Sequence, residues 1–106
     1  MRRSVLHRDL DEATARAVVA EIAKDSANVF FTHHAEARMT ERGITRTQVL
    51  RCLTHGRITE GPYRDSNGSW KLSMNAASAD DVIAVVAALD WRESRGNYAI
   101  IVTTWR

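Results

Sequence analysis

The first quarter of the chain carries hydrophobic residues at helical spacing. Between residues 10 and 24 one stripe of a helix would collect Leu10, Ala13, Ala17, Val18 and Ile22. Asp9 followed by Glu12 is typical of a capping box, and Lys24 lies where the helix dipole favours a cation. The pattern predicts a helix over residues 10–24. The aromatic run at residues 28–32 then predicts a short strand or extended segment.

Two further helices are predicted before residue 57. Residues 34–42 form the first, which ends at Gly43, a residue suited to the left-handed conformation that closes a helix. Thr45 and Gln48 form a capping box that opens the second helix, which runs to residue 55 and stops at Gly56. Only Gly43 and Ile44 join the two helices, so they form a tight helical hairpin.

From residue 57 onward the hydrophobic period changes to two. Residues 57–65 and 69–75 flank Asn67-Gly68, a strong hairpin signal, with Trp70, Leu72 and Met74 on one face. The valine-rich residues 82–91 are followed by a turn-like segment, which favours a strand, and residues 98–105 predict another. We therefore expect an α+β domain, with the N-terminal helix and the helical hairpin packed on one face of a three- to four-stranded antiparallel sheet.

Size and composition set the broad class. The 106 residues, 44% hydrophobic, fit one domain over residues 1–106 with a core that needs no staple. Cys52 is the only cysteine, and no apolar stretch has the length of a signal peptide or a membrane span. These features predict a soluble cytoplasmic protein and exclude the secreted, membrane and disordered classes.

The formal charge of +2 is unevenly placed. Residues 33–57 hold five arginines against two glutamates, a net +3, whereas the segment before them is neutral and the one after them is slightly acidic. Within this basic segment His34, Arg38 and Arg42 recur every fourth residue and would form one stripe on a helix. We interpret the stripe as a phosphate-facing ridge with an imidazole at its end. The alternative is a solvated face on which Glu36 and Glu41 neutralise their neighbours.

Several other chemistries lack support. His33, His34, His55 and Cys52 show neither a Cys-x-x-Cys pair nor two histidines four residues apart, so we expect no metal and no other cofactor. Cys52 lies among apolar residues and is expected in the core. A second candidate set lies on the predicted sheet, where a cationic and aromatic platform for RNA would be formed by Lys71, Arg64, Tyr98 and Arg106. Simple solvent exposure of these strand positions is the alternative.

Residues 32–44 read Thr-His-His-Ala-Glu-Ala-Arg-Met-Thr-Glu-Arg-Gly-Ile. The pattern T-x-H-A-x-x-R-M-x-x-R-G-I resembles the signature of an uncharacterised bacterial family that is similar in layout to the RelE/ParE and BrnT toxins. In layout the whole chain also resembles the MqsR toxins, which cleave mRNA. In those toxins three aromatic-polar pairs lie near the site, and comparable places here hold Tyr63-Arg64, Trp70-Lys71 and Trp105-Arg106.

The resemblance implies a toxin of a toxin–antitoxin pair, a metal-independent endoribonuclease that cleaves mRNA by 2′-hydroxyl attack. Where arginine replaces the lysine of those toxins it cannot readily give up a proton, so Arg64 and Arg106 would stabilise charge. Proton transfer then falls to His34, His33, Lys71 or Tyr98. We expect the RNA phosphates to contact His33, Arg38, Arg42 and Arg46. The expected partners are mRNA and a cognate antitoxin.

A different class of function is compatible with the same residues. The domain would keep the fold and the basic surface but cleave nothing, as a nucleic-acid- or protein-binding module, a ParE-type inhibitor or an inactive relative.

Overall fold

The computed structural model describes residues 9–78 and 81–106. Over these residues the chain forms the helices α1 (Glu12–Ala23), α2 (His33–Arg42) and α3 (Arg46–His55), with a short 3-10 turn, η2 (Ser26–Asn28), after α1. The strands are β1 (Val29–Phe31), β2 (Arg57–Arg64), β3 (Trp70–Ser78), β4 (Asp81–Arg92) and β5 (Gly96–Trp105). They form one sheet in the order β1-β5-β4-β3-β2.

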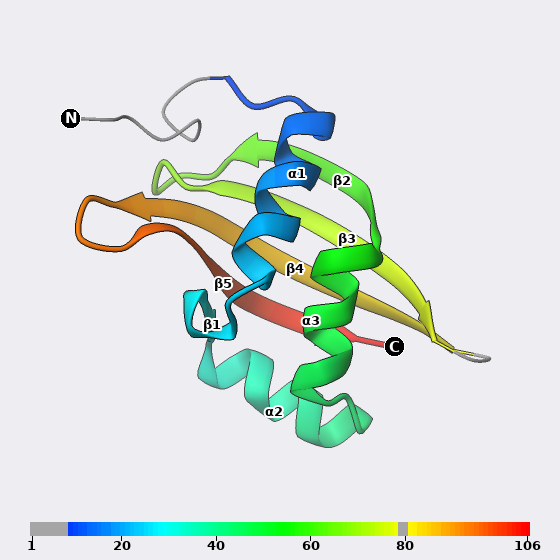
Figure 1. Ribbon diagram of the computed structural model, residues 1–106. Coiled ribbons are helices and arrows are strands. Elements are labelled where there is room, and N and C mark those ends of the chain that lie inside the picture. Colours follow the sequence, from blue (N-terminus) through cyan, green and yellow to red (C-terminus); the bar gives the residue numbers. More distant parts are fainter. Residues whose placement is uncertain (1–8, 79–80) are drawn as a thin grey trace.

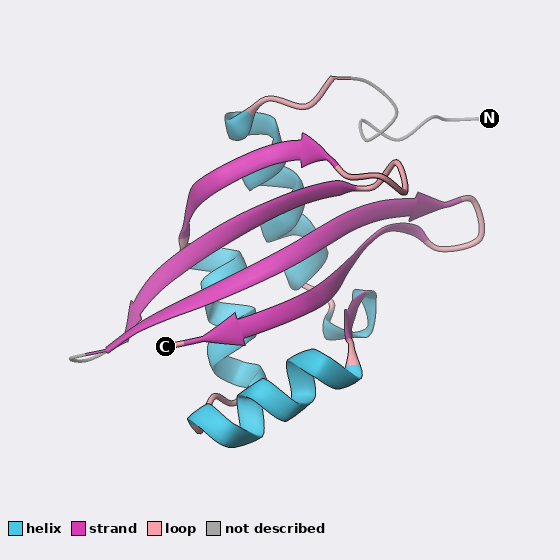
Figure 2. Ribbon diagram, turned by 180° about the vertical axis from the view of Figure 1, so that it is seen from behind, coloured by secondary structure: helices cyan, strands magenta, loops and turns pink. Residues whose placement is uncertain are grey.

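The helices do not all lie on the same side of the sheet. Helices α1 and α3 cover one face, whereas α2 lies along the sheet edge next to β5 (Figure 1). Figure 2 shows the opposite face of the sheet, which carries no helix among the described residues. The predicted α+β class is confirmed, and the position of α2 at the edge creates a boundary between a helix and the last strand.

The core lies between the sheet and the helices α1 and α3. Strand β4 alternates as predicted for a half-buried strand, and Ile83, Val85, Ala87 and Leu89 are buried against the helices. Leu72 and Met74 of β3 share that face and are fully buried, which confirms the predicted apolar side of the hairpin. Helix α1 contributes the buried residues Ala15, Val18, Val19 and Ile22.

The sheet differs from the prediction in strand number and direction. It has five strands, not three or four, and it is mixed because β1 pairs in parallel with β5, Val29 opposite Ala99. The remaining neighbours are antiparallel, as predicted. The Asn67-Gly68 hairpin is confirmed, but its loop is longer than two residues, since the N–H of Asp65 donates to the carbonyl of Ser69 across residues 66–68.

Most of the helix ends lie where the local sequence signals predict them. Gly43 has a φ of 66° and ends α2, and Thr45 and Gln48 form the predicted capping box of α3. The start of α1 is the exception. Asp11, not Asp9, is the N-cap, and its carboxylate accepts a hydrogen bond of 2.7 Å from the N–H of Thr14. None of the helices over the described residues is both long and apolar enough to cross a membrane.

Candidate functional site

A cavity of about 370 Å³ lies where α2 borders the end of β5. Helix α2 contributes the stripe predicted from the four-residue spacing, and β5 contributes the opposite wall. The lining residues are His34, Arg38, Arg42, Thr103, Thr104 and Trp105. The structure therefore places the stripe on a cavity whose second wall comes from a segment some sixty residues later in the chain. Within residues 9–78 and 81–106, no aspartate or glutamate lines this cavity.

Thr32 fixes the start of α2 against β5. Its hydroxyl accepts a hydrogen bond of 3.0 Å from the N–H of Ala35, which caps the helix, and donates one of 3.0 Å to the carbonyl of Val102. Its own N–H donates to the carbonyl of Ile101 at 3.1 Å. One side chain thus terminates β1, begins α2 and holds the helix to the strand that completes the cavity.

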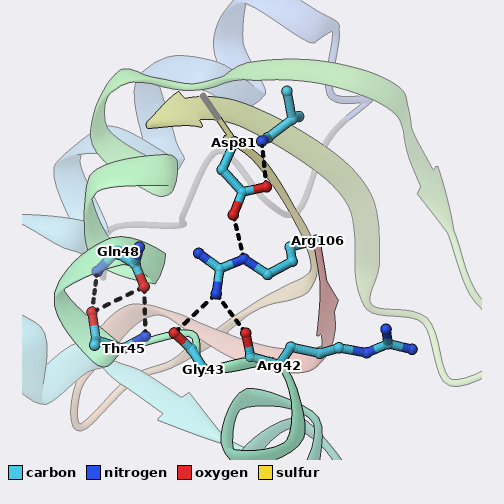
Figure 3. A network of polar contacts seen from close by, with 7 residues as sticks. Arg42, Gly43, Thr45, Gln48, Asp81 and Arg106 are labelled. Atoms are coloured by element: carbon cyan, nitrogen blue, oxygen red, sulfur yellow. Dashed lines mark hydrogen bonds and ion pairs between the residues drawn. The ribbon is translucent and has the colours of Figure 1, made fainter. Parts of the chain in front are cut away.

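Arg106 fixes the other end of α2. Its Nη1 donates to the carbonyl oxygens of Arg42 and Gly43 at 2.5 and 3.2 Å, and its Nε contacts the Asp81 carboxylate (Figure 3). These carbonyls end a helix and have no partner within it, so the guanidinium caps the C-terminus. Figure 3 also shows that the Arg42 side chain extends away from this network. Arg106 therefore supports the cavity from outside its lining.

The cations of the basic segment divide into paired and unpaired groups. Arg38 forms an exposed ion pair with Glu41 at 3.2 Å, whereas Arg42 forms none with any residue that the structure describes. Arg46 pairs with Glu36 at 3.2 Å and its guanidinium lies 4.5 Å from the centre of the Phe31 ring, so it is held away from the cavity. Glu41 thus neutralises a cation of the stripe, as considered, whereas Glu36 pairs with Arg46 of α3. Exposed His33 is adjacent to the cavity in sequence but not among its lining residues.

Thr104 is an unusual residue in the cavity wall. It is completely buried, and its hydroxyl oxygen has no hydrogen-bond partner among the described residues. A buried hydroxyl without a partner costs about 1–3 kcal/mol, so such groups are rare. Because the oxygen is inaccessible from outside, a ligand in the cavity does not reach it in this conformation. Nothing in the sequence distinguishes Thr104 from its neighbour Thr103.

The residues predicted to form a platform on the sheet are not brought together. Arg64 stacks over Trp70, 4.5 Å from the ring centre, and donates to the carbonyl of Gly68 in the β2–β3 turn. Lys71 is half-buried between Tyr63 and Ala88 on neighbouring strands. Tyr98 is buried beside Phe30. Arg64, Lys71 and Arg106 line neither the α2–β5 cavity nor the separate cavity around Tyr98.

Two further cavities involve residues outside the predicted site. One, of about 330 Å³, surrounds Phe30, Tyr98, Arg92 and Arg95. The other, of about 470 Å³, lies between α3 and the ends of β3 and β4 and is lined in part by Arg51, His55 and Arg57. Arg51, His55 and Arg57 belong to the basic segment at residues 33–57, so the uneven charge already pointed to this part of the chain. Arg92 and Arg95 gave no such signal, because acidic residues surround them in sequence.

The side-chain arrangement bears on two further chemistries, the reactivity of the Cys52 thiol and metal binding. Cys52 is buried in the core, and desolvation raises its pKa to about 11, so the thiol stays protonated near neutral pH. Among the described histidines, cysteines, aspartates and glutamates, no group of three is arranged to hold a metal ion.

Comparisons with known proteins give one match. No curated protein and no solved structure matches the chain. The family described as "Domain of unknown function (DUF4258)" matches residues 31–106, which hold every residue lining the α2–β5 cavity. Helix α1 precedes the matched region, yet it packs into the same core. Because the match covers well over half of the chain, the protein belongs to this family of domains of unknown function.

Proposed function

We propose that the protein is a metal-independent endoribonuclease that binds RNA in the α2–β5 cavity and acts as the toxin of a toxin–antitoxin pair. The observation that carries the proposal is the composition of this cavity. His34, Arg38 and Arg42 line it together with Trp105, which is 47% exposed, and no carboxylate lines it among the residues that the structure describes. A proton-transfer group, two cations and an exposed indole are the groups that RNA binding and cleavage require.

Each side chain has a role that follows from its chemistry. The guanidinium of Arg42, which has no ion pair with a described residue, is suited to bidentate contact with a phosphate. Arg38 is a second cation, although it also forms an exposed ion pair with Glu41. Trp105 offers an exposed face on which a base stacks.

The proposed reaction is an internal displacement at phosphorus. The imidazole of His34 accepts the proton of the ribose 2′-hydroxyl, and the 2′-oxygen forms a bond to the adjacent phosphorus. The bond from phosphorus to the 5′-oxygen breaks, and that oxygen takes a proton from the imidazolium or from water. Arg38 and Arg42 stabilise the charge that develops on the phosphoryl oxygens. The products are a cyclic phosphate and a free 5′-hydroxyl.

The geometry narrows the set of residues expected to act on RNA. Lys71, Arg64 and Tyr98 lie outside the cavity, and Arg106 acts as a positioning residue that holds α2. The toxin role and the antitoxin partner are supported by the resemblance in layout between this chain and small bacterial toxins. We propose that the antitoxin, encoded alongside, covers the basic cavity.

One observation favours a second candidate, a binding module that does not cleave. Among the described residues that line the α2–β5 cavity, His34 provides the single imidazole. A single imidazole would have to act as both base and acid, whereas phosphate binding needs only the arginines. This module would bind RNA with a steep dependence on salt concentration and leave it intact.

The two candidates are separated by purified protein and a mixed transcript in buffer containing a chelator. The endoribonuclease produces new 5′-hydroxyl ends, detected by labelling with polynucleotide kinase. We expect His34→Gln to reduce the cleavage rate at least about 100-fold. His55→Gln serves as the matched control, because His55 lies on α3 and lines a different cavity. Salt-dependent binding without new ends would reject the endoribonuclease in favour of the binding module, and absence of both would reject both candidates.

A further inference from the structure

The cavity around Tyr98 lies on the same edge of the sheet as the proposed phosphate site. Its walls come from β1 and the residue that follows it, from β5, from the end of β4 and from the turn that joins β4 to β5. The lining residues are Phe30, Phe31, Thr32, Arg92, Arg95, Tyr98 and Ile100. No acidic side chain is among them, and two of them are arginines. At about 330 Å³ the space is of the size expected for a small aromatic group.

Aromatic rings and guanidinium groups alternate in this cavity. The rings of Phe30 and Tyr98 meet edge to face, with their centres 5.8 Å apart. The guanidinium of Arg95 lies 4.9 Å from the centre of the Phe30 ring, and that of Arg92 lies 5.7 Å from the centre of the Tyr98 ring. Aromatic rings and guanidinium planes are the surfaces on which unpaired nucleobases stack.

Part of this arrangement is already fixed by the fold. Arg95 Nη1 donates to the Ala27 carbonyl at 3.1 Å and to the Asn28 side-chain oxygen at 3.3 Å, which holds the guanidinium in place. Tyr98 is only 7% exposed and packs against Phe30, which is 40% exposed. Exposure of the apolar Phe30 ring to water is unfavourable, but the ring is available to a ligand without rearrangement.

The two cavities follow one another along β5. Thr32 lines the second cavity and caps α2, two residues before His34. On β5, Tyr98 and Thr104 are six residues or about 20 Å of extended backbone apart. The nearest lining residues on that strand, Ile100 and Thr103, are about 10 Å apart. A ligand that reaches both cavities must therefore be elongated, and a chain of several nucleotides provides phosphates for one and a base for the other.

We infer that the cavity formed by Phe30, Tyr98, Arg92 and Arg95 is a nucleobase subsite that stacks an unpaired base of single-stranded RNA. This inference rests on the proposal that the phosphates of the same strand bind in the α2–β5 cavity. Stacking needs a free base face, so the subsite selects single strands over duplexes. Every base has such a face, so the subsite tolerates different sequences.

The test uses an oligomer that the protein cannot cleave. A 2′-O-methyl RNA of eight nucleotides carries one fluorescent 2-aminopurine, whose emission is quenched when it stacks. Its partner oligomer has an abasic site at that position and an equal number of phosphates. We expect the intact oligomer to bind wild-type protein with quenching, and the abasic one to bind about 5- to 100-fold more weakly, the range for one lost base stack.

Variants of the lining residues test whether the base stacks in this cavity. Phe30→Ala should weaken binding of the intact oligomer by a similar factor and remove the quenching, whereas Phe30→Tyr, which keeps the ring, should restore both. Val82→Ala is the matched control, since it shortens another exposed apolar side chain, outside this cavity. Arg92→Gln provides a second test, because Arg92 is exposed and its loss should weaken quenching without disturbing the core.

The outcomes separate this inference from the proposed function. If Phe30→Ala and Arg92→Gln both bind and quench like wild type, the subsite is rejected, even when transcripts are cleaved. If quenching requires Phe30 but no transcript is cleaved, the subsite stands and the endoribonuclease is rejected. If the oligomer does not bind wild-type protein at all, both are rejected.

Discussion

The guanidinium of Arg106 caps the helix that carries Arg42, since its Nη1 lies 2.5 Å from the carbonyl oxygen of Arg42. The contact uses the backbone of Arg42 and leaves its side chain on the cavity. The two arginines therefore have separate duties. One holds the end of α2 to β5, and the other presents a cation to whatever occupies the cavity between them.

Replacement of Arg106 should affect stability first. Arg106→Ala removes the hydrogen bonds to the Arg42 and Gly43 carbonyls and the contact with Asp81, and we expect unfolding to become easier by about 1–3 kcal/mol. Arg106→Lys keeps the charge but not the forked geometry and should recover part of that loss. Urea denaturation measures both. A variant of native stability that no longer cleaves RNA would instead return Arg106 to the reacting centre.

Replacement of Arg42 should have the opposite profile. Arg42→Gln leaves the backbone carbonyl that Arg106 contacts, so the free energy of unfolding should change by less than about 0.5 kcal/mol. RNA affinity should fall, and the slope of log affinity against log salt concentration should decrease by about 1, the amount expected for one lost phosphate contact. Lys24→Gln, at the exposed residue that follows α1, controls for the change in net charge. An unchanged slope would remove Arg42 from the RNA site.

The sequence predicts the helices well because their signals are local. Gly43 and the Thr45–Gln48 box act within one turn of chain, and the first ends α2 and the second begins α3 where expected. The sheet depends on longer separations. The short strand β1 joins it only through parallel pairing with β5, about seventy residues later, and no local pattern specifies that partner. The predicted strand count was therefore low by at least one.

In the candidate site, too, the features that depend on local sequence were predictable and those that depend on tertiary contacts were not. The spacing of His34, Arg38 and Arg42 suffices to align them, because it depends only on helical geometry. The opposite wall at Thr104, and the use of Arg106 as a cap, depend on how β5 docks beside α2. Residue type made Arg106 a candidate for catalysis, and only the tertiary contact identifies it as a structural group.

Replacement of Thr104 tests whether its hydroxyl serves a ligand. Thr104→Val removes the buried hydroxyl and keeps nearly the same shape, so we expect the protein to become more stable by about 1 kcal/mol. RNA affinity should stay within about twofold of wild type, because the buried hydroxyl is inaccessible from the cavity. Thr104→Ser, which keeps the hydroxyl, should bind RNA like wild type. Destabilisation by Thr104→Val would show that the hydroxyl already has a partner in the folded protein.

Replacement of Cys52 should alter the dependence of stability on pH. Burial raises the pKa of this thiol from its ordinary 9.0 to about 11, although the charge of Arg16 acts in the opposite direction. Between these values the unfolded chain releases the thiol proton and the folded protein keeps it. The unfolded state then binds fewer protons, so stability falls as pH rises through this window, by roughly 2–3 kcal/mol in total. Cys52→Ala lacks the effect but leaves a small cavity, a cost that does not depend on pH. Wild type should therefore exceed the variant by a constant margin from pH 6 to 8, and the margin should shrink between pH 9 and 11. Urea denaturation at each pH gives both curves, and parallel curves up to pH 11 would mean that the thiol ionises as easily in the fold as in the unfolded chain.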